Sequence, residues 1–158
     1  MNKSESVTME TSPSLAEVKL SYKSKVPAET LPEVTSPEQA AGVLYQLWDD
    51  DYIEFKEQFV VLLLNNAKRC IGWSRISTGG TTATIVDPGT VFQVALLGNA
   101  VSVIVAHNHP SGNLQPSGSD RKLTERIKKS GELLGITLED HIIITADGYM
   151  SFRSKGIL

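Results

Sequence analysis

The sequence predicts an α/β fold in which a mixed β-sheet lies between helices, in one compact domain that follows a polar arm. Three observations predict it. Of the 158 residues, 41% are hydrophobic and 21% are charged, which is typical of a globular chain. Two nearly continuous apolar runs, within residues 57–64 and 100–106, are typical of strands buried on both faces. Segments of helical periodicity alternate with such strands, in the order α-β-β-β-α-β-α-β-β.

Residues 1–35 are expected to form a loose arm. They are rich in Ser, Thr, Pro, Glu and Lys, and they hold too few large apolar groups to offset the entropy of ordering them. Within the arm, apolar and polar residues alternate over 18–22, which favours one strand at the edge of a sheet. The compact domain is predicted over residues 36–158.

The first helix is predicted to begin after Ser36, because Ser36-Pro37-Glu38-Gln39 combines a capping serine, proline at the first helical position and glutamine at the third. The acidic run at 49–51 is expected to end this helix and to lie in solvent. Strands are predicted at 57–64, 69–76 and 81–86.

The second half of the chain repeats the alternation. Asp87 is expected to cap a helix that runs to about Gly98, and a strand follows at 100–106. Ser117 is expected to cap a long helix that runs to about Leu134. Residues 142–145 and 149–152 are predicted to form a closing hairpin around Asp147-Gly148.

Composition excludes several classes of function. The net charge of −3 argues against strong nonspecific binding to nucleic acid. Cys70 is the single cysteine, so no internal disulfide forms and C-x-x-C zinc sites are excluded; we expect it to be a small buried apolar group. No apolar run reaches about 18 residues, which predicts no membrane span, and the first residues lack the apolar core of a signal peptide. We therefore expect a cytoplasmic protein with no membrane partner.

One short constellation indicates chemistry. His107 and His109 follow a buried strand at positions i and i+2, so both rings point to the same side of an extended chain. After a Pro/Gly turn, Ser117 caps the next helix and Asp120 occupies its third position. Two imidazoles and one carboxylate are three N/O ligands, the number typical of catalytic zinc with one position left open. The hypothesis is a metal site.

Other residues receive structural interpretations. His141 is expected to begin a strand and to hold a neighbouring loop, without binding the metal. The basic residues of 121–129 are expected to form a solvated helix face, and they are the one local place for a phosphate backbone. No H-E-x-x-H occurs, and the chain is too short for the barrel of about 250 residues in which amidohydrolases carry H-x-H.

The pattern H-x-H-P-x6-S-x-x-D, with a glutamate far upstream, resembles the JAMM motif of the JAB1/MPN-domain metalloproteases. Within that superfamily, the runs HNHPSG, PS..D, DHIIIT and the final SF resemble the bacterial RadC family over about residues 36–158. The resemblance implies a JAB1/MPN-like, cytidine-deaminase-like mixed sheet flanked by helices. The family's P-R-E-x-F reads PGTVF at 88–92, which touches no ligand, and we expect the short form without a helix-hairpin-helix region.

The resemblance also implies roles for site residues. His107, His109 and Asp120 would bind one Zn²⁺ per chain, and Ser117 would help to hold the oxyanion of a tetrahedral intermediate. The activity implied is that of a zinc metallopeptidase that cleaves a peptide or isopeptide bond in an unidentified protein or peptide substrate.

The remaining member of the motif is a glutamate that acts as general base. Glu54 and Glu57 are both candidates. Glu57 is preferred because it immediately precedes the buried strand, where the family places its glutamate.

Two other functions stay open beside the hydrolase. One is a DNA-repair-associated protein, as the family name suggests, whose metal serves a nuclease or a structural role. The other is an interaction module with an idle site. The negative net charge and the lack of a recognised nucleic-acid module favour the hydrolase, with weak or no binding to nucleic acid.

Overall fold

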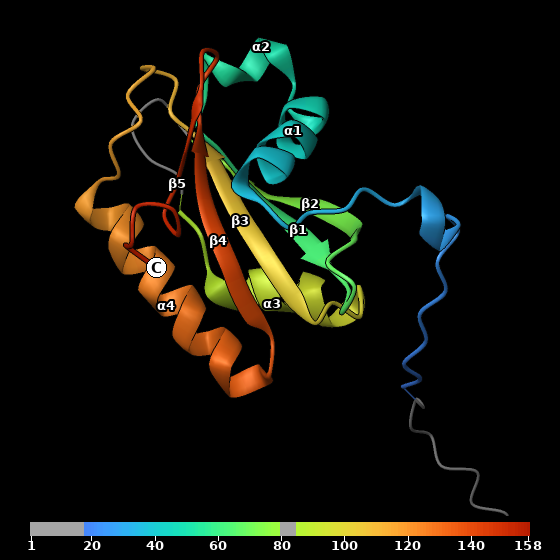
Figure 1. Ribbon diagram of the computed structural model, residues 1–158. Coiled ribbons are helices and arrows are strands. Elements are labelled where there is room, and N and C mark those ends of the chain that lie inside the picture. Colours follow the sequence, from blue (N-terminus) through green and yellow to red (C-terminus); the bar gives the residue numbers. More distant parts are fainter. Residues whose placement is uncertain (1–17, 80–84) are drawn as a thin grey trace, which may run out of the picture.

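The computed structural model describes residues 18–79 and 85–158. Within them, five strands form one sheet flanked by helices (Figure 1). The elements in chain order are η1 (Ala28–Thr30), α1 (Pro37–Leu47), α2 (Asp50–Ile53), β1 (Gln58–Leu64), β2 (Cys70–Thr78), α3 (Pro88–Leu97), β3 (Ser102–Asn108), α4 (Gly118–Leu134), β4 (Thr137–Ile144) and β5 (Tyr149–Ser151).

The sheet is mixed, as predicted. Its strand order is β2-β1-β3-β4-β5. β1 pairs antiparallel with β2 and β3, β3 pairs parallel with β4, and β4 pairs antiparallel with β5. The parallel pair is joined through α4, so one crossover places the ends of β3 and β4 beside the start of that helix (Figure 1).

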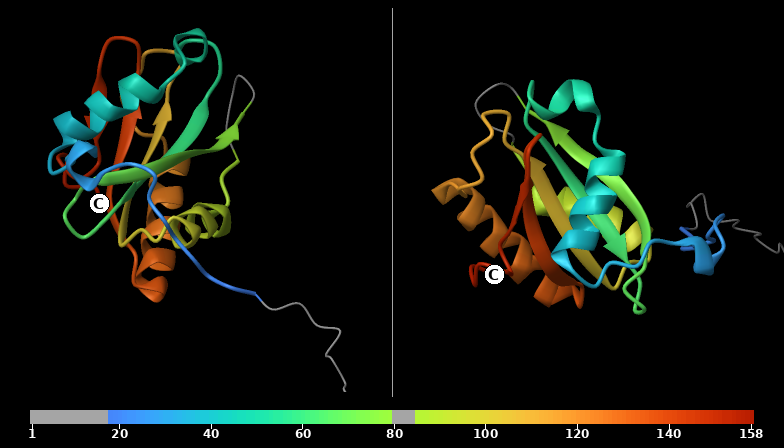
Figure 2. Two further views of the ribbon diagram at one scale, coloured as in Figure 1. Left: turned by 90° about the vertical axis from the view of Figure 1, so that its right-hand side faces the viewer. Right: turned by 45° about the horizontal axis from the view of Figure 1, so that its top comes forward.

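The two faces of the sheet carry separate cores. Side chains that alternate along the strands, such as Leu62 and Ile104, pack against Leu44 of α1. Their neighbours on the other face, such as Val105, pack against α3 and against Ile127 of α4. Figure 2 shows α1 on one side of the sheet and α3 with α4 on the other. Period-2 alternation therefore assigns each residue of β3 to one face or the other. In β4 it does so from Asp140 onwards, because the register with β3 shifts by one residue between Leu138 and Asp140.

The N-terminal segment differs from its prediction at 18–22. No strand forms there: these residues are exposed, and the apolar pair Val18 and Leu20 remains 85% and 89% exposed. The N-terminal segment instead contacts the sheet at Glu33, which forms an isolated antiparallel bridge with Arg69, the residue before β2. Val34 is buried, and its amide donates to the Lys68 carbonyl at 2.8 Å, so contacts with the domain begin upstream of Ser36.

The helix starts agree with the sequence. Ser36 and Ser117 each form a capping box, and Asp87 caps α3. The acidic run was expected to end α1, but α1 already ends at Leu47. Asp49 instead caps α2, so the acidic residues lie at the start of a helix, where its dipole favours them. Their exposure is as predicted.

The strands that follow α3 are as many as the sequence predicts, whereas the strand predicted at 81–86 is not observed among the described residues. Residues 81–84 lie outside the described residues, and Ile85 and Val86 belong to no strand. The last hairpin forms as expected, although β4 begins at Thr137, upstream of the predicted 142. Cys70 is buried, as predicted. In the described part of the chain, no helix is long and apolar enough to span a bilayer.

Candidate metal centre

The two histidines of the H-x-H motif lie where β3 ends. His107 is still within β3, one position further than the predicted strand, and only 1% of it is exposed. Alternation along β3 places it on the face covered by α3 and α4. His109 follows the strand, and its amide donates to the Ile144 carbonyl of β4 at 3.0 Å. Both rings are thereby fixed at the edge of the sheet nearest the start of α4.

The third member, Asp120, is held by the capping box of α4. The Ser117 amide donates to Asp120 Oδ2 at 2.6 Å, and the Asp120 amide donates to Ser117 Oγ at 3.1 Å. This reciprocal pair fixes the carboxylate at the first turn of the helix, where the helix dipole stabilises its negative charge. The other oxygen, Oδ1, is directed towards His107.

The three side chains converge. His107 Nε2 and His109 Nε2 lie 2.9 Å apart, and they lie 3.4 and 3.6 Å from Asp120 Oδ1 and Oδ2 respectively. One ligand atom from each residue lies within 4.8 Å of the others. The predicted set of His107, His109 and Asp120 is therefore brought together at bonding range of a single ion.

The outer nitrogens of both rings are already engaged. His109 Nδ1 lies 2.5 Å from the Asn113 carbonyl, which only accepts, so this nitrogen carries the proton and Nε2 presents a lone pair. His107 Nδ1 lies 2.8 Å from Nε2 of His141. Two inward-facing nitrogens and a carboxylate that approach one another repel unless a positive charge lies between them. The N/N/O donor set fits Zn²⁺, which binds neutral imidazole and carboxylate.

The electrostatics of the cluster also favour a cation. Burial raises the pKa of Asp120, but His107, His109 and the Ser117 hydrogen bond outweigh it and hold that pKa well below its ordinary value. The neighbouring Asp120 carboxylate raises the pKa of His109. The carboxylate is therefore ionised at neutral pH, and it stabilises positive charge at the Nε2 atoms.

A cavity of about 630 Å³ opens on the cluster. Glu57 lines it together with the three converging residues, Ser117 and Arg126. Glu57 is half-buried and directly precedes β1. Glu54, the other candidate, is the exposed C-cap of α2 and does not line this cavity.

The middle residue of the H-N-H motif holds the segment that carries Glu57. Asn108 is fully buried and points to the face opposite His107. Its Nδ2 donates to the carbonyls of Ile53 at 2.8 Å and Lys56 at 2.9 Å, and its Oδ1 accepts from the Gln58 amide at 2.7 Å. The backbone on both sides of Glu57 is therefore tied to the strand that carries the two histidines.

His141 differs from its prediction. It lies in the middle of β4, fully buried, and it contacts β3 and α4 instead of holding a loop. It is not one of the three residues whose ligand atoms converge. The sequence analysis missed Thr124 and Asn113, which touch the outer nitrogens of His141 and His109. For Thr124 a signal existed, because it lies four residues after Asp120 on the same helix face.

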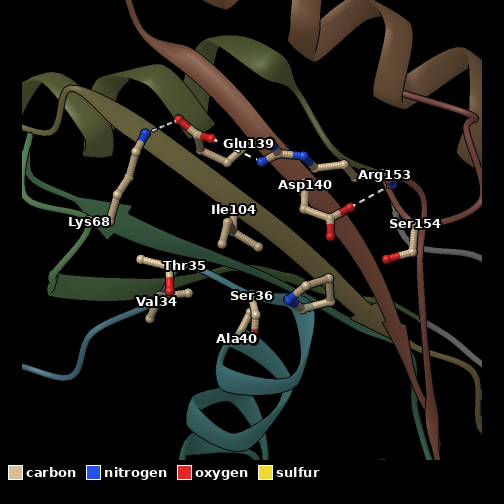
Figure 3. A pocket seen from close by; sticks show the side chains of 11 residues that line it. Val34, Thr35, Ser36, Ala40, Lys68, Ile104, Glu139, Asp140, Arg153 and Ser154 are labelled. Atoms are coloured by element: carbon tan, nitrogen blue, oxygen red, sulfur yellow. Dashed lines mark hydrogen bonds and ion pairs between the residues drawn. The ribbon is translucent and has the colours of Figure 1, made fainter.

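A second cavity, of about 420 Å³, lies on the α1 face of the sheet (Figure 3). Its charged groups are paired with one another: the Glu139 carboxylate binds both Lys68 and Arg153. Asp140 points into it and accepts from the Arg153 amide at 3.0 Å, from the His141 amide at 2.8 Å and from the Ser151 hydroxyl. Adjacent residues of β4, Asp140 and His141, thus serve opposite faces of the sheet.

Comparison with known proteins identifies the family of this chain. Residues 34–157 match the family described as RadC-like JAB domain. Proteins named "UPF0758 protein" are similar: one from Flavobacterium johnsoniae is 46% identical over 101 residues, 64% of this chain and 44% of that protein. One from Thermotoga maritima is 43% identical over 107 residues, 68% of this chain and 48% of that protein. One from Desulforamulus reducens is 40% identical over 134 residues, 84% of this chain and 57% of that protein.

The chain spans about half the length of these curated relatives. The family match covers most of the chain and includes every residue of the converging cluster. The chain belongs to the RadC-like JAB domain family.

Proposed function

We propose that this member of the RadC-like JAB domain family is a zinc-dependent hydrolase that cleaves an amide bond, in a peptide or an isopeptide. The observation that carries the proposal is the convergence of two imidazole nitrogens and an ionised carboxylate in one cavity with a second carboxylate, that of Glu57. His107, His109 and Asp120 would hold the ion. Three protein ligands leave one position of a tetrahedral site for water or substrate.

Zinc bound there would lower the pKa of water to about 7 and polarise the carbonyl of the scissile bond. Glu57 would act as general base. Its carboxylate would take a proton from the attacking water and pass it to the amide nitrogen as the C–N bond breaks. The water oxygen ends on the carbonyl carbon, so the products are a carboxylate and an amine. Asn108 supports this role, since it fixes the backbone on both sides of Glu57.

Ser117 would stabilise the oxygen that becomes negative during the reaction. Its Oγ accepts from the Asp120 amide, so the bond within the capping box leaves the hydroxyl proton to be donated elsewhere. Ser117 lines the cavity beside the converging ligands. Donors of this kind are worth about 10²–10³ in rate in other enzymes.

The test is metal analysis joined to a cleavage screen on the full chain. We expect about one zinc per chain, lost in H107A. A library of peptides and isopeptides then identifies a cleaved substrate. With that substrate, E57Q retains zinc and loses hydrolysis, while E54Q, the matched control in the same segment, retains both. A wild-type protein that binds no zinc, or an E57Q variant with unchanged turnover, would overturn the assignment.

A second candidate function is action on nucleic acid. It is favoured by one observation: Arg126, an exposed residue of the basic face of α4, also lines the metal-site cavity. On this reading the substrate would be a phosphodiester. Submicromolar DNA or RNA binding at physiological salt, with a steep dependence on salt, would support it. Weak binding that changes little with salt would leave the amide hydrolase as the one candidate.

A further inference from the structure

A buried chain of hydrogen-bonded side chains lies behind His107. The residues that extend it, on β4 and α4, are not among the three proposed metal ligands. His141 of β4 places Nε2 2.8 Å from His107 Nδ1. Its Nδ1 lies 2.6 Å from Thr124 Oγ1 of α4. Thr124 Oγ1 in turn lies 2.6 Å from the backbone carbonyl of Asp120. The chain therefore connects β3, β4 and α4 and ends at the residue that supplies the carboxylate ligand.

The direction of every bond in this chain follows from its last member. A backbone carbonyl only accepts, so the single hydroxyl proton of Thr124 is donated to the Asp120 oxygen. Thr124 Oγ1 then accepts, and the proton that it accepts belongs to His141 Nδ1. In a neutral ring, Nε2 of His141 consequently holds a lone pair and accepts the Nδ1 proton of His107. This leaves the lone pair of His107 on Nε2, where it faces His109 and Asp120.

The His141 ring lies in a buried aromatic box, a setting that favours an uncharged ring. The ring is fully buried, stacks on Phe152 at 4.5 Å between centroids and meets Phe59 edge-on at 5.7 Å. Packing alone does not call for a histidine in this aromatic box, because an apolar ring would fill it without two nitrogens that need partners.

We propose that His141 and Thr124 are positioning residues that hold His107 in the tautomer able to bind a metal through Nε2. His109 obtains the same tautomer from a backbone carbonyl, whereas His107 depends on two side chains. The proposal rests on the metal site proposed above, and it deepens that site by assigning its outer hydrogen bonds. Partners of this kind typically change metal affinity by about 10–100-fold.

The test compares T124V with T124S in the full chain. Valine keeps the shape of threonine and removes the hydroxyl, so His141 Nδ1 loses its acceptor and the chain of bonds loses its direction. We expect zinc affinity, measured by competition with a chelator, to fall by about 10–100-fold in T124V and to return to within about threefold of wild type in T124S. I143V, a buried change on the same strand and face as His141, is the control and leaves the affinity unchanged.

A second readout does not depend on zinc. Nitrogen-15 chemical shifts of the metal-free protein, recorded where the rings are neutral, report which ring nitrogen carries the proton. We expect Nδ1–H on both His107 and His141 in wild type and T124S, with the protons redistributed in T124V.

The two proposals fail in different ways. A wild-type protein that binds no zinc contradicts the metal site, while the ring tautomers still test the hydrogen-bond chain. Folded T124V with wild-type tautomers and wild-type affinity overturns the role of Thr124. H141F, which fills the box without nitrogens, gives the matching test for His141: an unchanged zinc affinity in a folded H141F would overturn its role as well.

Discussion

Asp120 and Asp140 are carboxylates on opposite faces of one sheet, and their surroundings differ in kind. Asp140 accepts from two backbone amides and one hydroxyl, so its lone pairs are matched by donors. Asp120 accepts from the Ser117 amide, and it otherwise faces two imidazole nitrogens that also present lone pairs. Acceptors that converge on acceptors need a cation, whereas acceptors matched by donors need nothing more. The direction of the surrounding hydrogen bonds is what separates the two carboxylates in kind.

The largest effects test this difference directly, through D120A and D140A. We expect D120A to weaken zinc binding by more than about a hundredfold, beyond the effect of losing an outer partner. D140A leaves buried donors without an acceptor, and we expect it to lower the free energy of unfolding by about 3 kcal/mol while zinc affinity stays within about threefold. Chelator competition and urea unfolding measure the two quantities. Stoichiometric zinc in D120A would contradict the metal site.

Zinc itself should act on one face only. At a free zinc concentration of about 100 times Kd, we expect the wild-type protein to gain about 2.7 kcal/mol in free energy of unfolding. H109A should gain nothing, and D140N should gain as much as wild type. Unfolding curves with added zinc and with excess chelator check this. An equal gain in H109A would mean that the ion binds elsewhere.

Asn108 sharpens the comparison because it neighbours His107 in sequence and belongs to the opposite face. N108A leaves the buried Gln58 amide and three backbone carbonyls without their partner, so we expect the free energy of unfolding to fall by about 2 kcal/mol. Zinc affinity should change by less than about twofold, since Asn108 touches no ligand nitrogen or oxygen. An N108A protein that kept its free energy of unfolding but lost zinc binding would show that the two faces of the sheet are not independent.

The smallest effect is a dependence on pH. Burial raises the pKa of Asp140, so the folded state holds this proton to a higher pH than the unfolded state does. As pH rises through the unfolded value of about 4 towards the folded value, the unfolded chain ionises first and stability is lost. We expect wild type to lose stability relative to D140N over this interval. If the free energies of unfolding of wild type and D140N changed in parallel with pH, this effect of Asp140 would be excluded.

Much of the site was predictable because its residues are local. His107, His109, Ser117 and Asp120 fall within one strand end, one turn and one helix cap, and each has a recognisable spacing. The beginning of β4 was not predictable in the same way. Glu139, Asp140 and His141 interrupt its apolar pattern. Glu139 and His141 are explained by partners far away in sequence, whereas Asp140 accepts from the hairpin that follows it.

His141 was predicted to begin a strand and hold a loop, and this was wrong because its partner is distant in sequence. Its partner His107 lies on β3, and the parallel register that brings the two strands together is a property of the whole sheet. The expected strand at 18–22 failed for the opposite reason. Its alternation is real, but the three side chains of Val18, Leu20 and Tyr22 supply too little buried area to hold a strand on the sheet.

The crossover from β3 through α4 to β4 supplies His107, His109, Asp120, Thr124 and His141, while Glu57 comes from the segment before β1. In the function proposed above, binding of the ion and transfer of the proton would therefore fall to two separate stretches of chain. A substitution of Glu57 during evolution would then abolish hydrolysis and leave a protein that still binds its metal. In such a homologue, bound metal would show common descent, and only a kinetic assay would show whether hydrolysis persists.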